Sequence, residues 1–167
     1  VFVGRLVGDK GFIEIVSAFK SFSIENGFRR RLKLLLVGPL ESDLDPLQTE
    51  TLREIKNNAS IIVTGFQEDV RPYLAISNVL AFPSYREGFG NVIAEAGSMG
   101  LPAIVTNING CNEIVEEGKN GLIIPVKNTK LLKEAILKLV EGSKLYHTLK
   151  SNAREMITSR YKQKIVW

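Results

Sequence analysis

The chain has 167 residues, of which 44% are hydrophobic and 24% are charged, and its net charge is +4. That length fits one domain with a continuous core and excludes a second domain of full size. The composition is typical of a soluble globular protein, and the lack of a long apolar run excludes a membrane span. No secretory or transit signal precedes Val1 to Val3, which already read as a strand, so we expect a fragment of a longer polypeptide.

Short apolar runs alternate with amphipathic stretches, which predicts parallel strands joined by crossover helices. The first strand is predicted at residues 2–4, and apolar residues at helical spacing predict a helix over 11–24. The remaining strands are expected at 34–37, 61–63, 79–82, 103–105 and 122–124, and the remaining helices at 46–57, 70–75, 91–99, 131–141 and 144–158.

This order of elements predicts an α/β fold. We expect a doubly wound, Rossmann-like and mostly parallel sheet of about six strands with helices on both faces. Strands as continuously apolar as these are typical of a sheet that is covered on both faces. The ligand crevice of such a sheet lies beyond the carboxyl ends of the strands, so functional residues should follow strands and precede helices.

The segment 83–96 joins the fourth strand to a helix and reads Pro-Ser-Tyr-Arg-Glu-Gly-Phe-Gly-Asn-Val-Ile-Ala-Glu-Ala. Gly88 and Gly90 remove two Cβ atoms at this turn, so a ligand can approach the backbone closely. The backbone amides near Gly90 to Val92 are expected to point outward with the positive end of the helix dipole. That arrangement binds phosphate.

Two glutamates flank this turn. Glu95 lies one helical turn after Asn91, where its carboxylate could accept hydrogen bonds from a ribose diol. Glu87 could reach the hydroxyls of a group attached to the distal phosphate. The alternative interpretation makes Glu87 part of an ordinary loop and Glu95 a solvated helix residue.

The loop after the first strand, residues 4–11, carries two cations towards the same crevice. Arg5 offers a planar fork for phosphate oxygens and Lys10 a compact charge. Together they could neutralise the charge that develops on a departing diphosphate. In the alternative interpretation, Arg5 and Lys10 are ordinary solvated side chains of a loop.

Seven segments occur in an order that resembles a known family. They are Gly4-Arg5-Leu6 with Lys10-Gly11, Pro83-Ser84, Glu87-Gly88-Phe89-Gly90, Glu95-Ala96, Gly100-Leu101-Pro102, Gly110 with Glu113, and Gly118-Lys119-Asn120-Gly121-Leu122. The chain resembles the carboxyl-terminal, donor-binding domain of the group 1, or family 4, retaining glycosyltransferases of the GT-B fold. The spacing from Glu87 to Glu95 is similar to the paired-glutamate motif of that family.

The resemblance implies a role for each of these positions. Arg5 and Lys10 would hold the diphosphate of a nucleotide sugar, Glu87 would contact the donor sugar, and Glu95 would bind the ribose. The remaining donor-binding residues would be Gly4, Gly88, Phe89, Gly90, Asn91 and Val92, with Phe66 bordering the nucleobase after the third strand.

The resemblance also implies a reaction and a partner domain. Family members transfer a sugar from a nucleoside diphosphate to a glycan or lipid-linked acceptor with retention at the anomeric carbon, and we expect no metal or other cofactor. The acceptor site would belong to an amino-terminal domain absent from residues 1–167, so we expect this domain alone to bind donor without transferring sugar. Gly110-Cys111 departs from the two adjacent glycines that the family often has, which leaves the backbone path near the sugar open.

Two other functions remain as alternatives. A sugar-nucleotide epimerase shares the two-domain architecture, and a binding module could recognise a nucleotide sugar without catalysis. A nicotinamide cofactor is not expected, because Ile93 occupies the third glycine position of the dinucleotide fingerprint. The chain has no P-loop sequence, and nucleic acid is not an expected partner because no aromatic residues interleave with the basic ones.

Several polar features receive a plainer interpretation. Asp43 and Asp45 are taken as a solvated acidic turn, with a divalent cation as the alternative. The basic cluster of residues 29–31 with Lys33 is taken as a solvated loop, with peripheral contact to an anionic membrane surface as the alternative. His147 is expected on the surface. Cys111 cannot form an internal disulfide, which fits a reducing compartment. We therefore expect a cytoplasmic location, with a peripheral position at the inner face of the membrane as the alternative.

Overall fold

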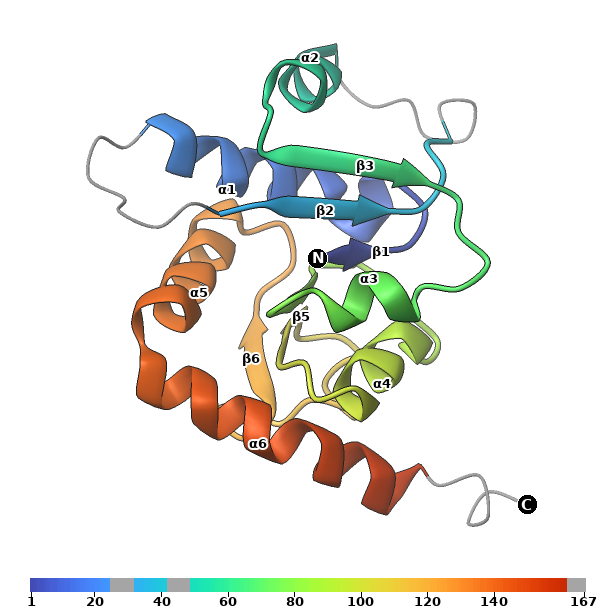
Figure 1. The fold of residues 1–167 in the computed structure, drawn as a ribbon, viewed down its shortest axis with the longest axis vertical. Helices are drawn as coiled ribbons and strands as arrows, with labels where there is room; N and C mark the ends of the chain where they lie inside the picture. Colours follow the sequence, from blue (N-terminus) through green and yellow to red (C-terminus); the bar gives the residue numbers. More distant parts are fainter. Residues whose placement is uncertain (25–31, 42–48, 162–167) are drawn as a thin grey trace.

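The computed structural model describes residues 1–24, 32–41 and 49–161 (Figure 1). The strands are β1 (Phe2–Val3), β2 (Leu34–Val37), β3 (Ile61–Gly65), β4 (Leu80–Phe82), β5 (Ala103–Thr106) and β6 (Gly121–Ile124). The helices are the 3-10 turn η1 (Gly8–Lys10), α1 (Phe12–Ile24), α2 (Thr49–Asn57), α3 (Arg71–Ala75), α4 (Asn91–Ser98), α5 (Thr129–Glu141) and α6 (Ser143–Arg160). Each predicted strand is confirmed to within two residues.

The strands form two parallel three-stranded sheets, in the orders β1-β2-β3 and β4-β5-β6. They meet at the start of the chain, where the Val1 nitrogen donates to the Val79 carbonyl at 2.8 Å. The Ala81 nitrogen in turn donates to the Val1 carbonyl at 2.8 Å. The strand order across both sheets is therefore 3-2-1-4-5-6, which confirms the predicted doubly wound arrangement.

Helices pack on both faces. Helix α1 packs against α2 and α5, whereas α4 packs against α6 (Figure 1). The sheet extends from β1 towards β3 on one side and towards β6 on the other. Crossovers of the usual right hand then place the helices of the two halves on opposite faces. The carboxyl ends of all the strands consequently meet at one edge, as a crevice between two helix layers requires.

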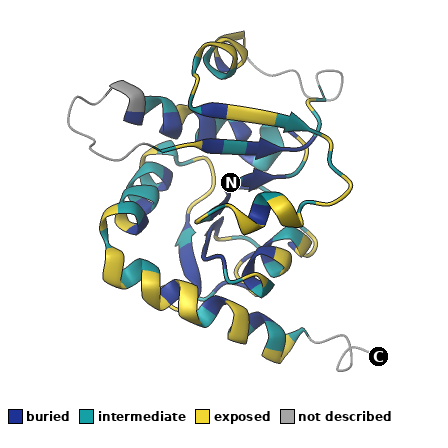
Figure 2. Cartoon of the chain, viewed as in Figure 1, coloured by how far each residue is buried: buried dark blue, intermediate teal, exposed yellow. Residues whose placement is uncertain are grey.

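The expectation that every strand is covered on both faces is wrong for β3. This edge strand leaves Ile62 and Val63 exposed by 45% and 44% (Figure 2). Strands β4 and β5, by contrast, are buried along their whole length. The apolar pattern predicted a strand correctly, but the cover over an edge strand depends on helices that lie elsewhere in the sequence.

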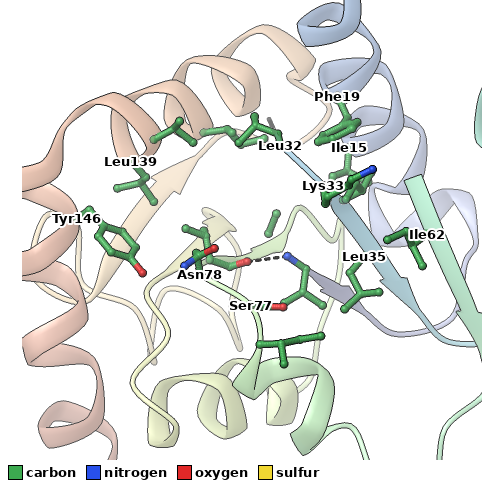
Figure 3. A pocket seen from close by; sticks show the side chains of 17 residues that line it. Ile15, Phe19, Leu32, Lys33, Leu35, Ile62, Ser77, Asn78, Leu139 and Tyr146 are labelled. Atoms are coloured by element: carbon green, nitrogen blue, oxygen red, sulfur yellow. Dashed lines mark hydrogen bonds between the residues drawn. The ribbon is translucent and has the colours of Figure 1, made fainter. Parts of the chain in front are cut away.

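An apolar cavity of about 670 Å³ lies at the amino-terminal edge of the sheet (Figure 3). Its walls come from α1, β2, β3, α5 and α6, and include Phe19, Ile62, Leu139 and Tyr146. This edge is opposite to the one at which the predicted ligand-binding loops emerge.

Candidate functional site

The loops that follow β1 and β4 lie against each other at the carboxyl edge of the sheet. The Tyr85 nitrogen donates to the Asp9 carbonyl at 2.8 Å, and Arg86 Nε donates to Asp9 Oδ2 at 3.0 Å. Gly11, which starts the turn into α1, has a φ of +68°, and a Cβ built on it would lie 2.0 Å from the Pro83 carbonyl oxygen. Two segments some 75 residues apart in the chain are therefore held in backbone contact.

Lys10 and Glu87 meet in the space between these loops. Lys10 Nζ forms an ion pair with Glu87 Oε1, and the two side chains are only 16% and 15% exposed. Such a partly desolvated pair interacts more strongly than an exposed one, because water screens it less. The structure thus places the predicted cation of the first loop directly beside the first glutamate of the predicted pair.

The hydroxyl of Ser84 lies beneath this ion pair. The residue is fully buried, and its Oγ lies 3.0 Å from Glu87 Oε1. Its own carbonyl accepts a hydrogen bond from Thr106 Oγ1 at the end of β5. The floor of the site is accordingly polar and is tied to two adjacent strands.

Arg5 occupies a different part of the edge. Its side chain is 49% exposed and pairs with Glu41 Oε2 at 3.3 Å, after β2. Within residues 1–24, 32–41 and 49–161, no hydrogen bond or ion pair joins Arg5 to Lys10 or Glu87. Gly4 lies beside it with a positive φ of +147°, and its nitrogen donates to the Val37 carbonyl at 2.9 Å. The structure therefore brings Lys10, but not Arg5, into contact with Glu87.

The start of α4 corrects part of the phosphate-binding prediction. The Gly90 nitrogen donates to the Gly110 carbonyl at 2.9 Å, and the Asn91 nitrogen donates to the Phe89 carbonyl at 2.9 Å. Both amides are engaged within the protein, that of Gly90 by the loop after β5 and that of Asn91 by its own loop. Of the three amides predicted to point outward, that of Val92 alone has no such bond among the described loop and cap contacts.

The glycines at this turn serve different purposes. A Cβ on Gly88 would meet no atom within 4 Å, so its surroundings are open to a ligand. A Cβ on Gly90 would lie 2.9 Å from the Gly110 carbonyl oxygen, so Gly90 is required by packing. Gly110, with a φ of +77°, leaves only 2.7 Å between a built Cβ and the Gly88 carbonyl oxygen. The backbone at Gly110 therefore packs closely against the loop that carries Gly88, and Cys111 is fully buried below this contact.

The second glutamate and the aromatic residues lie on the outer side of the site. Asn91 and Glu95 are both exposed on α4, and partial burial raises the pKa of Glu95. Phe66, after β3, is 70% exposed. Phe89 is 43% exposed and packs edge-on against Tyr161, with ring centroids 5.5 Å apart. Phe66 and Glu95 therefore present side chains that a ligand can reach.

The structure also shows the positions of His147 and Lys33. His147 is exposed on α6, as expected, with its ring edge-on to Tyr146. Lys33 is exposed as well, and its Nζ donates to the Ala59 carbonyl at 3.0 Å. The acidic turn of Asp43 and Asp45, the basic residues 29–31 and the predicted helix start at 46–48 lie outside the described residues.

The described residues contain neither a helix that could span a membrane nor a cluster of metal-ligating side chains. No helix among them has the length and apolar character needed to cross a membrane. No cluster of three or more His, Cys, Asp or Glu side chains in the same ranges is arranged as metal ligands would be. The expectation of a metal-free reaction stays a prediction.

Comparisons with known proteins agree with this geometry. A family model described as Glycosyl transferases group 1 matches residues 1–156. The capsular polysaccharide biosynthesis glycosyltransferase CapM of Staphylococcus aureus is 32% identical over 166 residues, which make up 99% of this chain and 43% of that protein. The chain therefore spans less than half the length of this relative.

Two solved structures show the same arrangement. Anabaena Alr3699/HepE in complex with UDP-glucose matches with a TM-score of 0.80 at 25% identity, over 96% of this chain and 43% of that one. The C-terminal domain of the group 1 family protein LpcC from Francisella tularensis shares the fold, with a TM-score of 0.84 at 22% identity over 97% of this chain and 85% of that one.

Proposed function

Because the chain belongs to the glycosyl transferases group 1 family, we propose that it is the donor-binding domain of a retaining glycosyltransferase of the GT-B fold. The enzyme would transfer a hexose-type sugar from a nucleoside diphosphate to a glycan or lipid-linked acceptor. The acceptor site would come from an amino-terminal domain outside residues 1–167, and the domain alone would bind donor without transferring sugar. The family match favours this function over a sugar-nucleotide epimerase.

The observation that carries the proposal is the contact between Lys10 and Glu87. It brings a cation and a carboxylate from two different loops to one point of the crevice. Anabaena Alr3699/HepE, whose fold this chain shares, was solved with UDP-glucose bound. A diphosphate and a sugar are the two chemical groups that a cation and a carboxylate, respectively, recognise by charge-assisted hydrogen bonds.

Each residue then has a defined task in the reaction. The bond between the anomeric carbon and the diphosphate oxygen would break, and a bond from that carbon to the acceptor hydroxyl oxygen would form on the same face. The hydroxyl proton would pass to the leaving diphosphate. Lys10 and Arg5 would stabilise the negative charge that develops on the leaving diphosphate, together with the Val92 amide. Glu87 would hold the sugar hydroxyls, Glu95 would hold the ribose, and Phe66 would border the base. Catalysis would rest on positioning and leaving-group stabilisation, with no metal.

Binding of UDP and of uridine to Lys10→Ala tests the charge assignment. A charge-assisted hydrogen bond contributes about 1.5–3 kcal/mol, so we expect Lys10→Ala to weaken UDP binding by at least about 10-fold. Uridine binding should change by less than about 2-fold, because it carries no phosphate. Arg5→Ala should show the same selectivity. Isothermal titration calorimetry measures the dissociation constants of the diphosphate and of the nucleoside. The same comparison is made with GDP and guanosine and with ADP and adenosine.

The matched control is Lys33→Ala, which removes an exposed lysine at the opposite edge of the sheet. It should leave both ligands unaffected. Equal losses for nucleoside and nucleoside diphosphate in Lys10→Ala would contradict the assignment of Lys10 to the diphosphate.

A further inference from the structure

The Ser84 hydroxyl is the one neutral group that holds the Glu87 carboxylate among the described contacts. Ser84 Oγ lies 3.0 Å from Glu87 Oε1, 3.1 Å from the Arg86 carbonyl oxygen and 3.5 Å from the Asp9 carbonyl oxygen. A hydroxyl has a single hydrogen to donate, and an ionised carboxylate is a stronger acceptor than a peptide carbonyl. The hydrogen bond to Glu87 is therefore the favoured one.

Ser84 is itself held in place from below. Both Ser84 and Thr106 are fully buried, and Thr106 Oγ1 donates to the Ser84 carbonyl. Because β4 and β5 are adjacent parallel strands, this bond ties the end of one strand to the end of the next. The backbone of Ser84 is thus fixed, which allows its hydroxyl to orient another side chain.

The two oxygens of Glu87 have different surroundings. Oε1 accepts from both Lys10 Nζ and Ser84 Oγ. Oε2 has no hydrogen-bond partner among the described residues, and it is not one of the buried unpaired atoms, so it is accessible to solvent. The Glu87 carboxylate is therefore held through Oε1, while Oε2 is free to accept a hydrogen bond from a ligand.

We propose that Ser84 is a positioning residue, which fixes Glu87 through Oε1 so that Oε2 is presented to the hydroxyls of the donor sugar. This inference rests on the function proposed above. Lys10 holds the same oxygen, but through a flexible four-carbon stem, and the diphosphate would compete for its ammonium group. Ser84 would then be the contact that keeps Glu87 in place while donor is bound.

If Ser84 acts in this way, its removal should weaken binding of the sugar but not binding of the nucleotide. In Ser84→Ala the affinity for UDP should change by less than about 2-fold, because Ser84 is not assigned to the diphosphate. The affinity for UDP-glucose should fall by about 10-fold, the loss expected when one hydrogen bond to a charged group no longer holds the sugar-binding carboxylate. A role limited to packing would lower both affinities by the same factor.

A double-mutant cycle with Glu87→Ala tests whether Ser84 acts through Glu87. Residues that act as one unit are not additive, so Ser84→Ala should have no further effect on the ratio of UDP to UDP-glucose affinity once Glu87 is alanine. Ser84→Thr, which keeps the hydroxyl, should restore the ratio. Urea denaturation of each variant reports folding, and Ser77→Ala, which removes a hydroxyl bonded to the Tyr73 carbonyl at the opposite edge, should leave the ratio unchanged.

The outcomes distinguish the two proposals. If the wild-type protein binds none of UDP-glucose, GDP-mannose and ADP-glucose, the proposed function fails and this inference fails with it. If it binds one of them, the series is run with that donor and its diphosphate. Equal losses in Ser84→Ala, or additive effects in the cycle, then overturn the role of Ser84 alone.

Discussion

Cys111 lies fully buried under the loop that carries Glu87. Burial, with a smaller contribution from the negative charge of Glu87, raises the pKa of its thiol from the usual 9.0 to about 12. Only the thiolate reacts rapidly with alkylating agents. The Cys111 thiol beneath the loop that carries Glu87 is therefore a structural group.

The native protein should resist alkylation of this cysteine. At pH 8 we expect iodoacetamide to react with Cys111 at least ~100-fold more slowly in the folded protein than in urea, because the pKa difference lowers the thiolate fraction about 1000-fold. The chain has one cysteine, so mass spectrometry of the whole protein reports the rate directly. Equal rates in buffer and urea would show that the thiol is not buried.

The same pKa shift gives a direction for stability at high pH. The unfolded state releases the thiol proton near pH 9, whereas the folded state keeps it up to about pH 12. The unfolded state therefore binds fewer protons in this interval, and the free energy of unfolding should fall as the pH rises from about 9 to about 12. Cys111→Ser would remove this contribution at alkaline pH.

At the scale of elements, the turn into α1 and the loop after β4 are in close backbone contact at the site. Gly11 and Gly118 both have left-handed backbone, with φ of +68° and +72°. They differ in their surroundings, since a Cβ on Gly11 would lie 2.0 Å from the Pro83 carbonyl oxygen and one on Gly118 would meet nothing within 4 Å.

Alanine at these two glycines should have unequal costs. Gly118→Ala should lower the free energy of unfolding by about 1 kcal/mol, the cost of a left-handed conformation for an L-residue. Gly11→Ala should cost more than about 3 kcal/mol, because the backbone of two loops must also separate. Urea denaturation monitored by circular dichroism measures both, and equal costs would show that the two loops are not in backbone contact.

At the scale of the whole molecule, aromatic side chains join the two halves of the sheet. The Phe2 ring of β1 stacks on the Phe82 ring of β4 with centroids 6.2 Å apart. It also lies edge-on to the Phe12 ring of α1 at 6.0 Å. All three residues are buried, so the core is continuous across the boundary between the two three-stranded sheets.

Phe82→Ala should consequently destabilise both halves together. We expect a loss of about 3–5 kcal/mol in the free energy of unfolding, the usual cost of removing a buried aromatic ring. Hydrogen exchange should show a parallel loss of protection for amides in β2 and in β5. Loss of protection in β5 alone would mean that the two sheets unfold independently. Ile76→Ala, at a side chain that is 76% exposed, should change stability very little.

Local patterns predicted the elements and the edge at which the site lies. Each strand and helix depends on the spacing of apolar residues within about ten neighbours, which is visible in a single sequence. The convergence of the loops after β1 and β4 also followed, because parallel strands bring their carboxyl ends to one edge. That basis placed the loops of Lys10 and Glu87 at one crevice.

Only the tertiary structure decided which polar groups near that edge have partners within the protein and which surfaces stay exposed. Arg5 has its partner in Glu41 after β2, the Gly90 amide donates to the Gly110 carbonyl, and the edge strand β3 is left partly exposed. Ser84 follows the fourth strand in the sequence, yet lies buried beneath Glu87 in the fold. Each of these facts depends on a contact between segments distant in the chain, whose distance and direction are set by packing and not by local sequence.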